Sequence, residues 1–305
     1  MRAVRKSGKG GMSLKQVSAA DVIHVWDKNT PPVLHVADGE TVVFETAKPG
    51  IPDETFTRDY TVEPYPKRVL GITGPVYVDG AEPGDVLKLE IRSIELDNWG
   101  KMWMGQWMGI LMDEVDHCYM KKVTVDEKGV RFNEKLRLPL KPMIGTIGVA
   151  PAGEPVNCVL PGDFGGNMDN LDICAGNTLY LPVSVPGALL ALGDVHAAMG
   201  YGEVLGTGVE IGSKVTLRVE VLKDQKLDWP LVETKESYEV IASGTDMAEN
   251  CREATRRAIR FVQQRTGLGF DEAYALVGQT SDLKILQVVN YSSSIVMEIP
   301  KAVLQ

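Results

Sequence analysis

The stretch Gly84-Asp85-Val86-Leu87-Lys88-Leu89-Glu90 decides the fold class. A turn glycine and an acidic residue precede alternating apolar positions, which is the period of a strand with one buried face. The same pattern returns at 39–45, 176–181 and 212–218, at unequal intervals that exclude a solenoid. We therefore expect a mostly β protein, α+β overall, with a β-sandwich or jelly-roll-like core of many short strands.

Towards the C-terminus the apolar period changes from that of strands to that of helices. Asp246 followed by Glu249 resembles a capping box, and Gly267 suits the end of the helix. A second short helix is expected from Glu272 to about Val277. Its expected cap and terminator are Asp271 and Gly278. An apolar stripe at helical spacing supports the first helix: Met247, Cys251, Ala254, Ala258 and Val262.

These patterns divide the chain into four parts. We expect a flexible leader (1–12), a β-sandwich catalytic core (13–222), a polar connector (223–240) and a helix-containing C-terminal part packed on the core (241–305). The leader is basic and glycine-rich and lacks the apolar centre of a secretory signal.

Composition limits the kinds of partner. The 305 residues carry a net charge of −9, which disfavours nucleic acid or an anionic membrane surface. No apolar stretch reaches the roughly 18–20 residues that cross a bilayer. The four cysteines are scattered without a CxxC pair, which indicates reduced thiols and a cytoplasmic protein.

The run 189–203, LLALGDVHAAMGYGE, holds the strongest candidates for chemistry. Asp194 and His196 stand at i and i+2 of an apolar strand, so their side chains are expected on one face. Glycines and a second carboxylate, Glu203, follow. The set suits metal ligation or acid–base catalysis. The alternative is a buried histidine that a neighbouring carboxylate holds for structure alone.

Other segments offer further candidates. In 161–170, Asn167 and Asp169 follow two glycines that would allow close approach to a ligand, or that form only a turn capped by Asp169. His24, before Trp26-Asp27 in an expected strand, is the best second imidazole.

Two segments allow either a functional or a packing role. The glycines at 145 and 148 could expose amides to an oxyanion, or only make room in a tightly packed strand. The Met/Trp-rich stretch 99–112 is expected in the core or an interface, or as a lid over an apolar pocket.

No GxSxG, P-loop, HExxH or GxGxxG motif is present in the sequence. Nucleophilic serine or cysteine catalysis therefore lacks support. Metal-activated water, or paired acid–base groups, remains.

Several blocks, in matching order, resemble the acetamidase/formamidase family. They are PVYVDGAEPGDVL (75–87), KPMIGTIGVAP (141–151), GGNMD (165–169), and LPV (181–183) followed by ALGDVHAAMGYGE (191–203). The resemblance implies a metal-assisted β-sandwich amidohydrolase that releases ammonia from formamide, acetamide or similar amides. It implies an oligomer, for which we expect a homodimer. It also implies a set of residues lining the site: Asn167, Asp169, Asp194, His196 and Glu203.

Three stretches depart from the family pattern: 45–52, 105–109, and Tyr201 in place of an aspartate in Gly-Asp-Gly-Glu. They keep two alternatives open. One is a non-catalytic β-sandwich that binds a small ligand, and the other is a hydrolase of a different C–N bond, such as a cyclic amide.

Our hypothesis is hydrolysis of a short aliphatic amide by metal-activated water. Asp194 and His196 are the expected metal ligands, with His24 or Asp169 completing the set. We expect zinc, which accepts mixed imidazole and carboxylate ligands. Calcium is the alternative, because Asp169, Asp194 and Glu203 could supply a mostly oxygen shell.

The expected catalytic residues are Glu203, Asn167 and Asp169. Glu203 is the candidate general base, which later returns the proton to the departing ammonia. Asn167 and glycine amides would orient the amide and stabilise the oxyanion.

Overall fold

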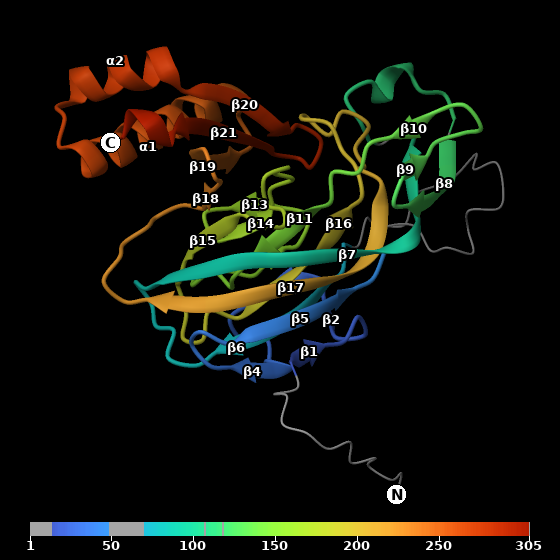
Figure 1. The fold of residues 1–305 in the computed structure, drawn as a ribbon, viewed down its shortest axis with the longest axis horizontal. Helices are drawn as coiled ribbons and strands as arrows, with labels where there is room; N and C mark the ends of the chain where they lie inside the picture. The colour runs from blue at the N-terminus through green and yellow to red at the C-terminus, as the bar shows by residue number, and fades with distance from the viewer. Residues whose placement is uncertain (1–13, 49–69, 107, 118, 305) are drawn as a thin grey trace, which may run out of the picture.

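Strands make up most of the structure, which confirms the expected mostly β class. The structure is a computed structural model that describes residues 14–48, 70–106, 108–117 and 119–304 (Figure 1). Among these residues, nineteen strands join one curled and mostly antiparallel sheet, and two short strands pair separately. The expected leader, residues 1–12, lies outside the described residues.

The strands before residue 140 are β1 (Lys15–Val17), β2 (Val22–Ile23), β3 (Val25–Trp26), β4 (Leu34–Val36), β5 (Thr41–Thr46), β6 (Ile72–Val78), β7 (Val86–Met104), β8 (Tyr119–Asp126), β9 (Gly129–Arg131) and β10 (Arg137–Leu138). The later strands are β11 (Met143–Gly148), β12 (Val156–Asn157), β13 (Pro161–Gly162), β14 (Gly165–Asn167), β15 (Thr178–Pro182), β16 (Leu190–His196), β17 (Glu210–Leu222), β18 (Leu231–Glu233), β19 (Ser237–Gly244), β20 (Asp282–Gln287) and β21 (Ser293–Pro300). The helices are α1 (Met247–Thr266) and α2 (Phe270–Thr280), with short 3₁₀ turns at Met112–Glu114 and Lys301–Val303.

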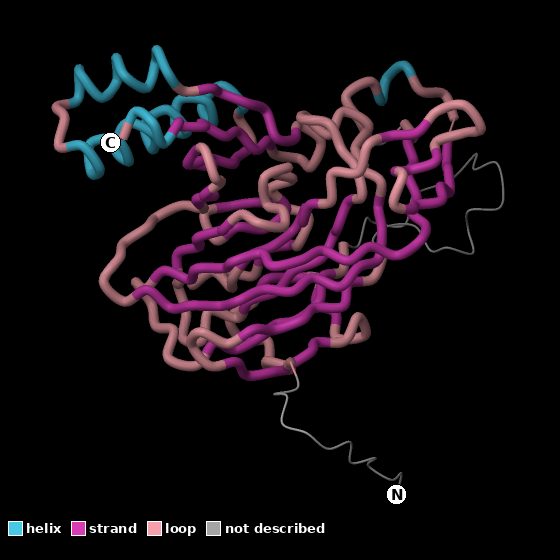
Figure 2. The backbone as a smooth tube through the Cα atoms, viewed as in Figure 1, coloured by secondary structure: helices cyan, strands magenta, loops and turns pink. Residues whose placement is uncertain are grey.

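The sheet folds back on itself in two layers (Figure 2). In one layer β17 pairs with β5 and with the long strand β7, and β15 pairs with β7. In the other, β16 lies between β6 and β11, and β11 also pairs with β14. The layers meet where His196, the last residue of β16, pairs with Glu210, the first of β17.

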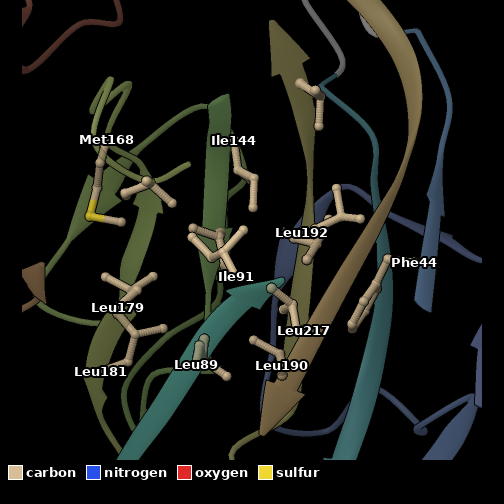
Figure 3. Close-up of a cluster of buried hydrophobic side chains, with 14 of the residues drawn as sticks. Phe44, Leu89, Ile91, Ile144, Met168, Leu179, Leu181, Leu190, Leu192 and Leu217 are labelled. Carbon is tan, nitrogen blue, oxygen red and sulfur yellow. The ribbon is translucent and has the colours of Figure 1, made fainter. Parts of the chain in front are cut away.

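The main core contains side chains from both layers (Figure 3). Phe44, Leu89 and Leu217 come from β5, β7 and β17 and join Ile144 and Leu192 of β11 and β16. All five are fully buried. Buried and less buried positions alternate along β5 and along the relevant parts of β7 and β17, whereas β11 and β16 are buried at every position. Burial of this apolar surface is the main driving force that holds the layers together.

The C-terminal part packs helices on a continuation of the sheet. The strands β18, β19, β21 and β20 pair in that order, and a second buried cluster joins β19 and β21 to both helices. Asp246 caps α1 by accepting a hydrogen bond from the Glu249 amide, and Gly267 ends the helix at φ 73°, as expected.

Two expected features differ from the structure. The second helix starts at Phe270 with Gly269 as its N-cap, so Asp271 and Gly278 lie inside it. Gly212 lies within β17 and precedes no strand. A side-chain Cβ at Gly212 would lie 2.5 Å from Asp97 Oδ2, which explains a glycine inside a strand.

The expected connector, 223–240, contains β18 and the start of β19. Leu231 and Val232 of β18 are buried, and β18 joins β15 to β19. The strand β18 was not predicted because three residues are too few to show the alternation of apolar and polar side chains that marks a strand. Among the residues that the structure describes, no helix is long and apolar enough to cross a membrane.

Candidate metal and catalytic site

The strand β16 carries Asp194 and His196 through the buried interior. The structure brings the two side chains together, with 3.7 Å between Asp194 Oδ1 and His196 Nε2. Asp194 has a φ of 57°, however, so the strand is not regular at this point. The two groups converge through a left-handed residue rather than through simple alternation.

Glu210 is a member of the site that sequence reasoning missed. It pairs directly with His196 across β16 and β17, and its Oε1 lies 3.3 Å from His196 Nε2. The same oxygen accepts a hydrogen bond from the Gly208 amide at 3.2 Å. A single acidic residue in the run TGVEI (207–211) is the only sequence signal, and the pairing of the two strands is invisible in the sequence.

Asp169 and Glu203 form a second group with His196. One ligand atom from each of these three residues lies within 4.8 Å of the others, and the same holds for Asp194, His196 and Glu210. His196 therefore belongs to both groups. The structure brings together four of the expected site residues: Asp169, Asp194, His196 and Glu203.

Three of these carboxylate residues have a left-handed backbone. The φ angles are 53° at Asp169, 57° at Asp194 and 45° at Glu203. Such conformations cost roughly 1–3 kcal/mol each for residues other than glycine and cluster at functional sites. The fold thus gives up stability to aim these carboxylates at one point.

Asn167 holds the carboxylates in place. With its amide oriented to satisfy both end atoms, Nδ2 lies 3.2 Å from Asp169 Oδ2 and 3.1 Å from Asp194 Oδ2, and Oδ1 accepts from Asn290 Nδ2 at 3.0 Å. The Thr146 hydroxyl donates to Asp194 Oδ2 at 3.0 Å. Asn290, from the β20–β21 loop, was not expected from the sequence. These contacts place the Asn167 amide between the Asp169 and Asp194 carboxylates.

The two glycines of β11 serve packing. A Cβ at Gly145 would lie 2.7 Å from Asp169 Oδ1 and from the Asp194 carbonyl, so Gly145 leaves space for both carboxylate residues. A Cβ at Gly148 would lie 2.7 Å from the Gly166 nitrogen. These contacts favour the packed-strand interpretation over an oxyanion hole.

His24 does not join the cluster. It lies between β2 and β3, is exposed, and has its Nδ1 3.2 Å from the Leu70 carbonyl oxygen. Neither of the two groups of possible metal ligands among the described residues includes it. Among the described residues, strand pairing places Glu210, and not His24, beside His196.

The cluster is almost completely enclosed. The exposed fractions are 0% for Asp169 and His196, 1% for Glu210, 2% for Asp194 and 3% for Glu203. Burial alone would lower the pKa of His196, but the Glu210 and Asp194 carboxylates outweigh it and hold that pKa well above its usual value.

The donor set fits a divalent metal ion. Neither ring nitrogen of His196 makes a hydrogen bond of good geometry with the described residues, and carboxylate oxygens surround the ring. Four buried carboxylates require positive charge nearby, which a divalent ion would supply. Imidazole and carboxylate are both ordinary ligands of zinc.

A cavity of about 430 Å³ borders the segments that carry the site. Its lining includes Pro142, next to Met143 of β11, and Asp172, three residues after Asp169. Tyr201, one of the departures from the family pattern, also lines it and donates a hydrogen bond to Asp172 Oδ2 at 3.1 Å. Residues 49–52 and Trp107, in the other two departures, lie outside the described residues.

The Met/Trp-rich stretch is divided between the interior and the surface. Trp103, at the end of β7, and Met108 are buried. Ile110, Leu111 and Met112 are exposed by 60%, 58% and 45%.

The fold and the buried cluster define a two-layer β protein with a carboxylate-rich histidine centre. The chain belongs to the acetamidase/formamidase family, whose model matches residues 13–158 and 152–305. The resemblance seen in the sequence blocks is thereby confirmed.

Solved structures and curated proteins support the assignment. A protein from Thermoanaerobacter tengcongensis, described as a predicted acetamidase/formamidase, is 37% identical with a TM-score of 0.90, over 95% of this chain and 97% of that one. An acetamidase from Bacillus halodurans is 37% identical with a TM-score of 0.89, over 94% and 98%. The acetamidase of Mycolicibacterium smegmatis is 26% identical over 216 residues, 50% of this chain and 53% of that protein. The matched part thus spans about half the length of the curated relatives.

Proposed function

We propose that the chain hydrolyses short aliphatic amides, such as acetamide or formamide, to a carboxylate and ammonia. One observation carries the proposal: an imidazole and four carboxylates converge in the interior of an acetamidase/formamidase family member. A purely structural histidine would need one carboxylate partner, and His196 has several.

We propose zinc as the metal, held by His196, Asp194 and Glu210. Calcium prefers oxygen ligands, and the imidazole that both ligand groups share argues against it. When bound, the ion supplies Lewis-acid chemistry that polarises the amide carbonyl and makes water acidic.

Glu203 is the proposed general base. Its carboxylate takes a proton from the water that attacks the carbonyl carbon, and it gives that proton to the amide nitrogen as the C–N bond breaks. Ammonia leaves, and the attacking oxygen stays in the carboxylate product. Asp169 shares the second ligand group with Glu203, and Asn167 holds Asp169 and Asp194 in position.

Ammonia release from formamide, acetamide, propionamide and a cyclic amide tests the function. We expect turnover of the short linear amides, its loss after treatment with a chelator, and its recovery with Zn²⁺. His196→Ala and Glu203→Gln should each reduce kcat by at least about a hundredfold. His35→Ala is the matched control, since His35 is exposed, contacts Asp79 and belongs to neither ligand group.

Two results would reject the proposal. A metal-loaded and folded protein without turnover of any linear amide indicates a ligand-binding protein. Turnover of the cyclic amide alone indicates a different C–N hydrolase.

The homodimer and the cytoplasmic location are further proposals. In the described part of the chain, Cys158, Cys174 and Cys251 are free, which suits a reducing compartment. Burial raises the pKa of the Cys158 thiol to about 12, so this thiol is unreactive. Light scattering of the purified protein tests the dimer, and a monomer at micromolar concentration would reject it.

A further inference from the structure

A buried lysine lies in the same row of strand partners as the proposed metal ligands. Lys101 of β7 is only 1% exposed. Lysine is almost never fully buried unless its charge is paired. The strand partners of Lys101 indicate which charged group it pairs with.

Strand register aligns three buried polar residues across three strands. Lys101 pairs with Glu210 between β7 and β17, and Glu210 pairs with His196 between β17 and β16. Directly opposed residues of antiparallel strands place their side chains on the same face, with Cβ atoms about 4.5–5.5 Å apart. Both register shifts of the β7–β17 pair lie beyond Ile211, so they leave this row intact. Lys101, Glu210 and His196 are therefore neighbours on one face.

The charges of the cluster explain why a lysine belongs in this row. Four carboxylates with exposed fractions of 0–3% surround one imidazole. A buried carboxylate is stable only with a nearby cation and satisfied hydrogen bonds. The register places Lys101 on the β7 side of Glu210, opposite to the side on which Glu210 pairs with His196.

We propose that Lys101 is a positioning residue for the metal centre. Its ammonium balances the charge of Glu210 and orients that carboxylate towards His196, and it thereby sets the affinity of the centre for the metal. In this role Lys101 acts on the metal through Glu210. The inference rests on the proposed metal centre and adds a residue to it.

Metal affinity, measured with Zn²⁺ and Co²⁺ against a chromophoric chelator, tests the inference. Lys101→Met should weaken binding by at least about tenfold, the usual loss when a residue that supports a metal ligand is removed. Glu210→Gln should lose at least as much. The double variant should be no more than about twofold weaker than Glu210→Gln alone, because Lys101 has no route to the metal without Glu210.

Lys122 supplies a matched control. It follows Lys101 in the same row, paired between β7 and β8, but it is exposed and its Nζ lies 3.8 Å from the centroid of the Trp99 ring. Lys122→Met should bind both metals within about twofold of the wild type. The electronic spectrum of bound Co²⁺ should change in Lys101→Met and stay unchanged in Lys122→Met.

Several outcomes overturn the inference. One is a folded Lys101→Met variant that binds metal as tightly as the wild type. Another is a double variant whose loss of binding free energy equals the sum of the losses in the two single variants. Should Lys101→Met not fold, Lys101→Arg decides: it keeps the charge and should bind within about threefold of the wild type, whereas affinity as weak as that of Glu210→Gln contradicts us. A wild type that binds metal and hydrolyses amides, with Lys101→Met unaffected, rejects this inference alone. A wild type that binds no metal rejects the proposed function as well.

Discussion

Gly208 packs directly against the His196 ring, and replacing it tests whether the imidazole position matters. A Cβ at residue 208 would lie 2.5 Å from His196 Cγ and Nδ1. Gly208→Ala must therefore displace the ring from Glu210. We expect a loss of roughly 1–3 kcal/mol in unfolding free energy from overpacking, together with at least about a tenfold loss of amide turnover.

Gly278→Ala is the control for this substitution. Gly278 lies in α2, and no neighbouring atom lies within 4 Å of the point that an added methyl group would occupy. Gly278→Ala should therefore gain roughly 0.5–1 kcal/mol of unfolding free energy and keep full activity. Thermal unfolding and ammonia release measure both variants. Unchanged activity in Gly208→Ala would mean that the ring position is unimportant.

Individual residues of the site were predictable to different degrees. Asp194 and His196 stand close in sequence, and the glycines beside them mark the segment, so local reasoning found them. Glu210 was missed because it meets His196 through a strand pairing between residues 14 positions apart in the chain. His24 lies outside both ligand groups, and residue type alone could not indicate this, because the position of its strand depends on distant pairings.

At the scale of elements, the two helix starts provide a direct comparison of capping. Asp246 accepts a hydrogen bond from the Glu249 amide at 3.0 Å, whereas Asp271 lies inside α2 and caps nothing. Asp246→Ala should cost about 1 kcal/mol of unfolding free energy. Asp271→Ala should cost less than about 0.5 kcal/mol, from the helix dipole alone. Urea unfolding measures both, and equal losses would contradict the assigned caps.

The elements that sequence reasoning found share a clear local signal. The strands β5, β7 and β15 follow a turn glycine, and α1 has both a capping aspartate and a C-terminal glycine. The start of α2 was misplaced because its N-cap, Gly269, has no side chain that could cap the helix. The pairing of β16 with β17 joins segments that are separated along the chain, which no local sequence pattern encodes.

At the scale of the whole molecule, Glu239 joins the C-terminal part to the core. It lies in β19, is fully buried, and accepts a hydrogen bond from Asn170 Nδ2 at 2.8 Å, next to Asp169. Burial, and then the charge of Asp172, raise the pKa of Glu239 from 4.5 to about 8. The native state thus keeps a proton that the unfolded chain releases.

This proton makes stability fall as the pH rises. Between about pH 4.5 and pH 8 the native state binds more protons than the unfolded state, so unfolding free energy decreases, by up to about 1.4 kcal/mol per pH unit. Glu239→Gln stays neutral in both states and should lose this slope, becoming more stable than the wild type towards pH 8. Glu236→Gln, whose side chain is 80% exposed, is the control and should keep the slope. Parallel stability profiles for Glu239→Gln and the wild type would contradict the assignment.

The metal content of purified protein tests the central claim most directly, because the mechanism depends on a cation among His196, Asp194 and Glu210. Elemental analysis should find about one divalent ion per chain in the wild type and in His24→Ala. Folded His196→Ala should retain almost none. Equal metal in His196→Ala and the wild type, or loss of the metal in His24→Ala, would contradict the account.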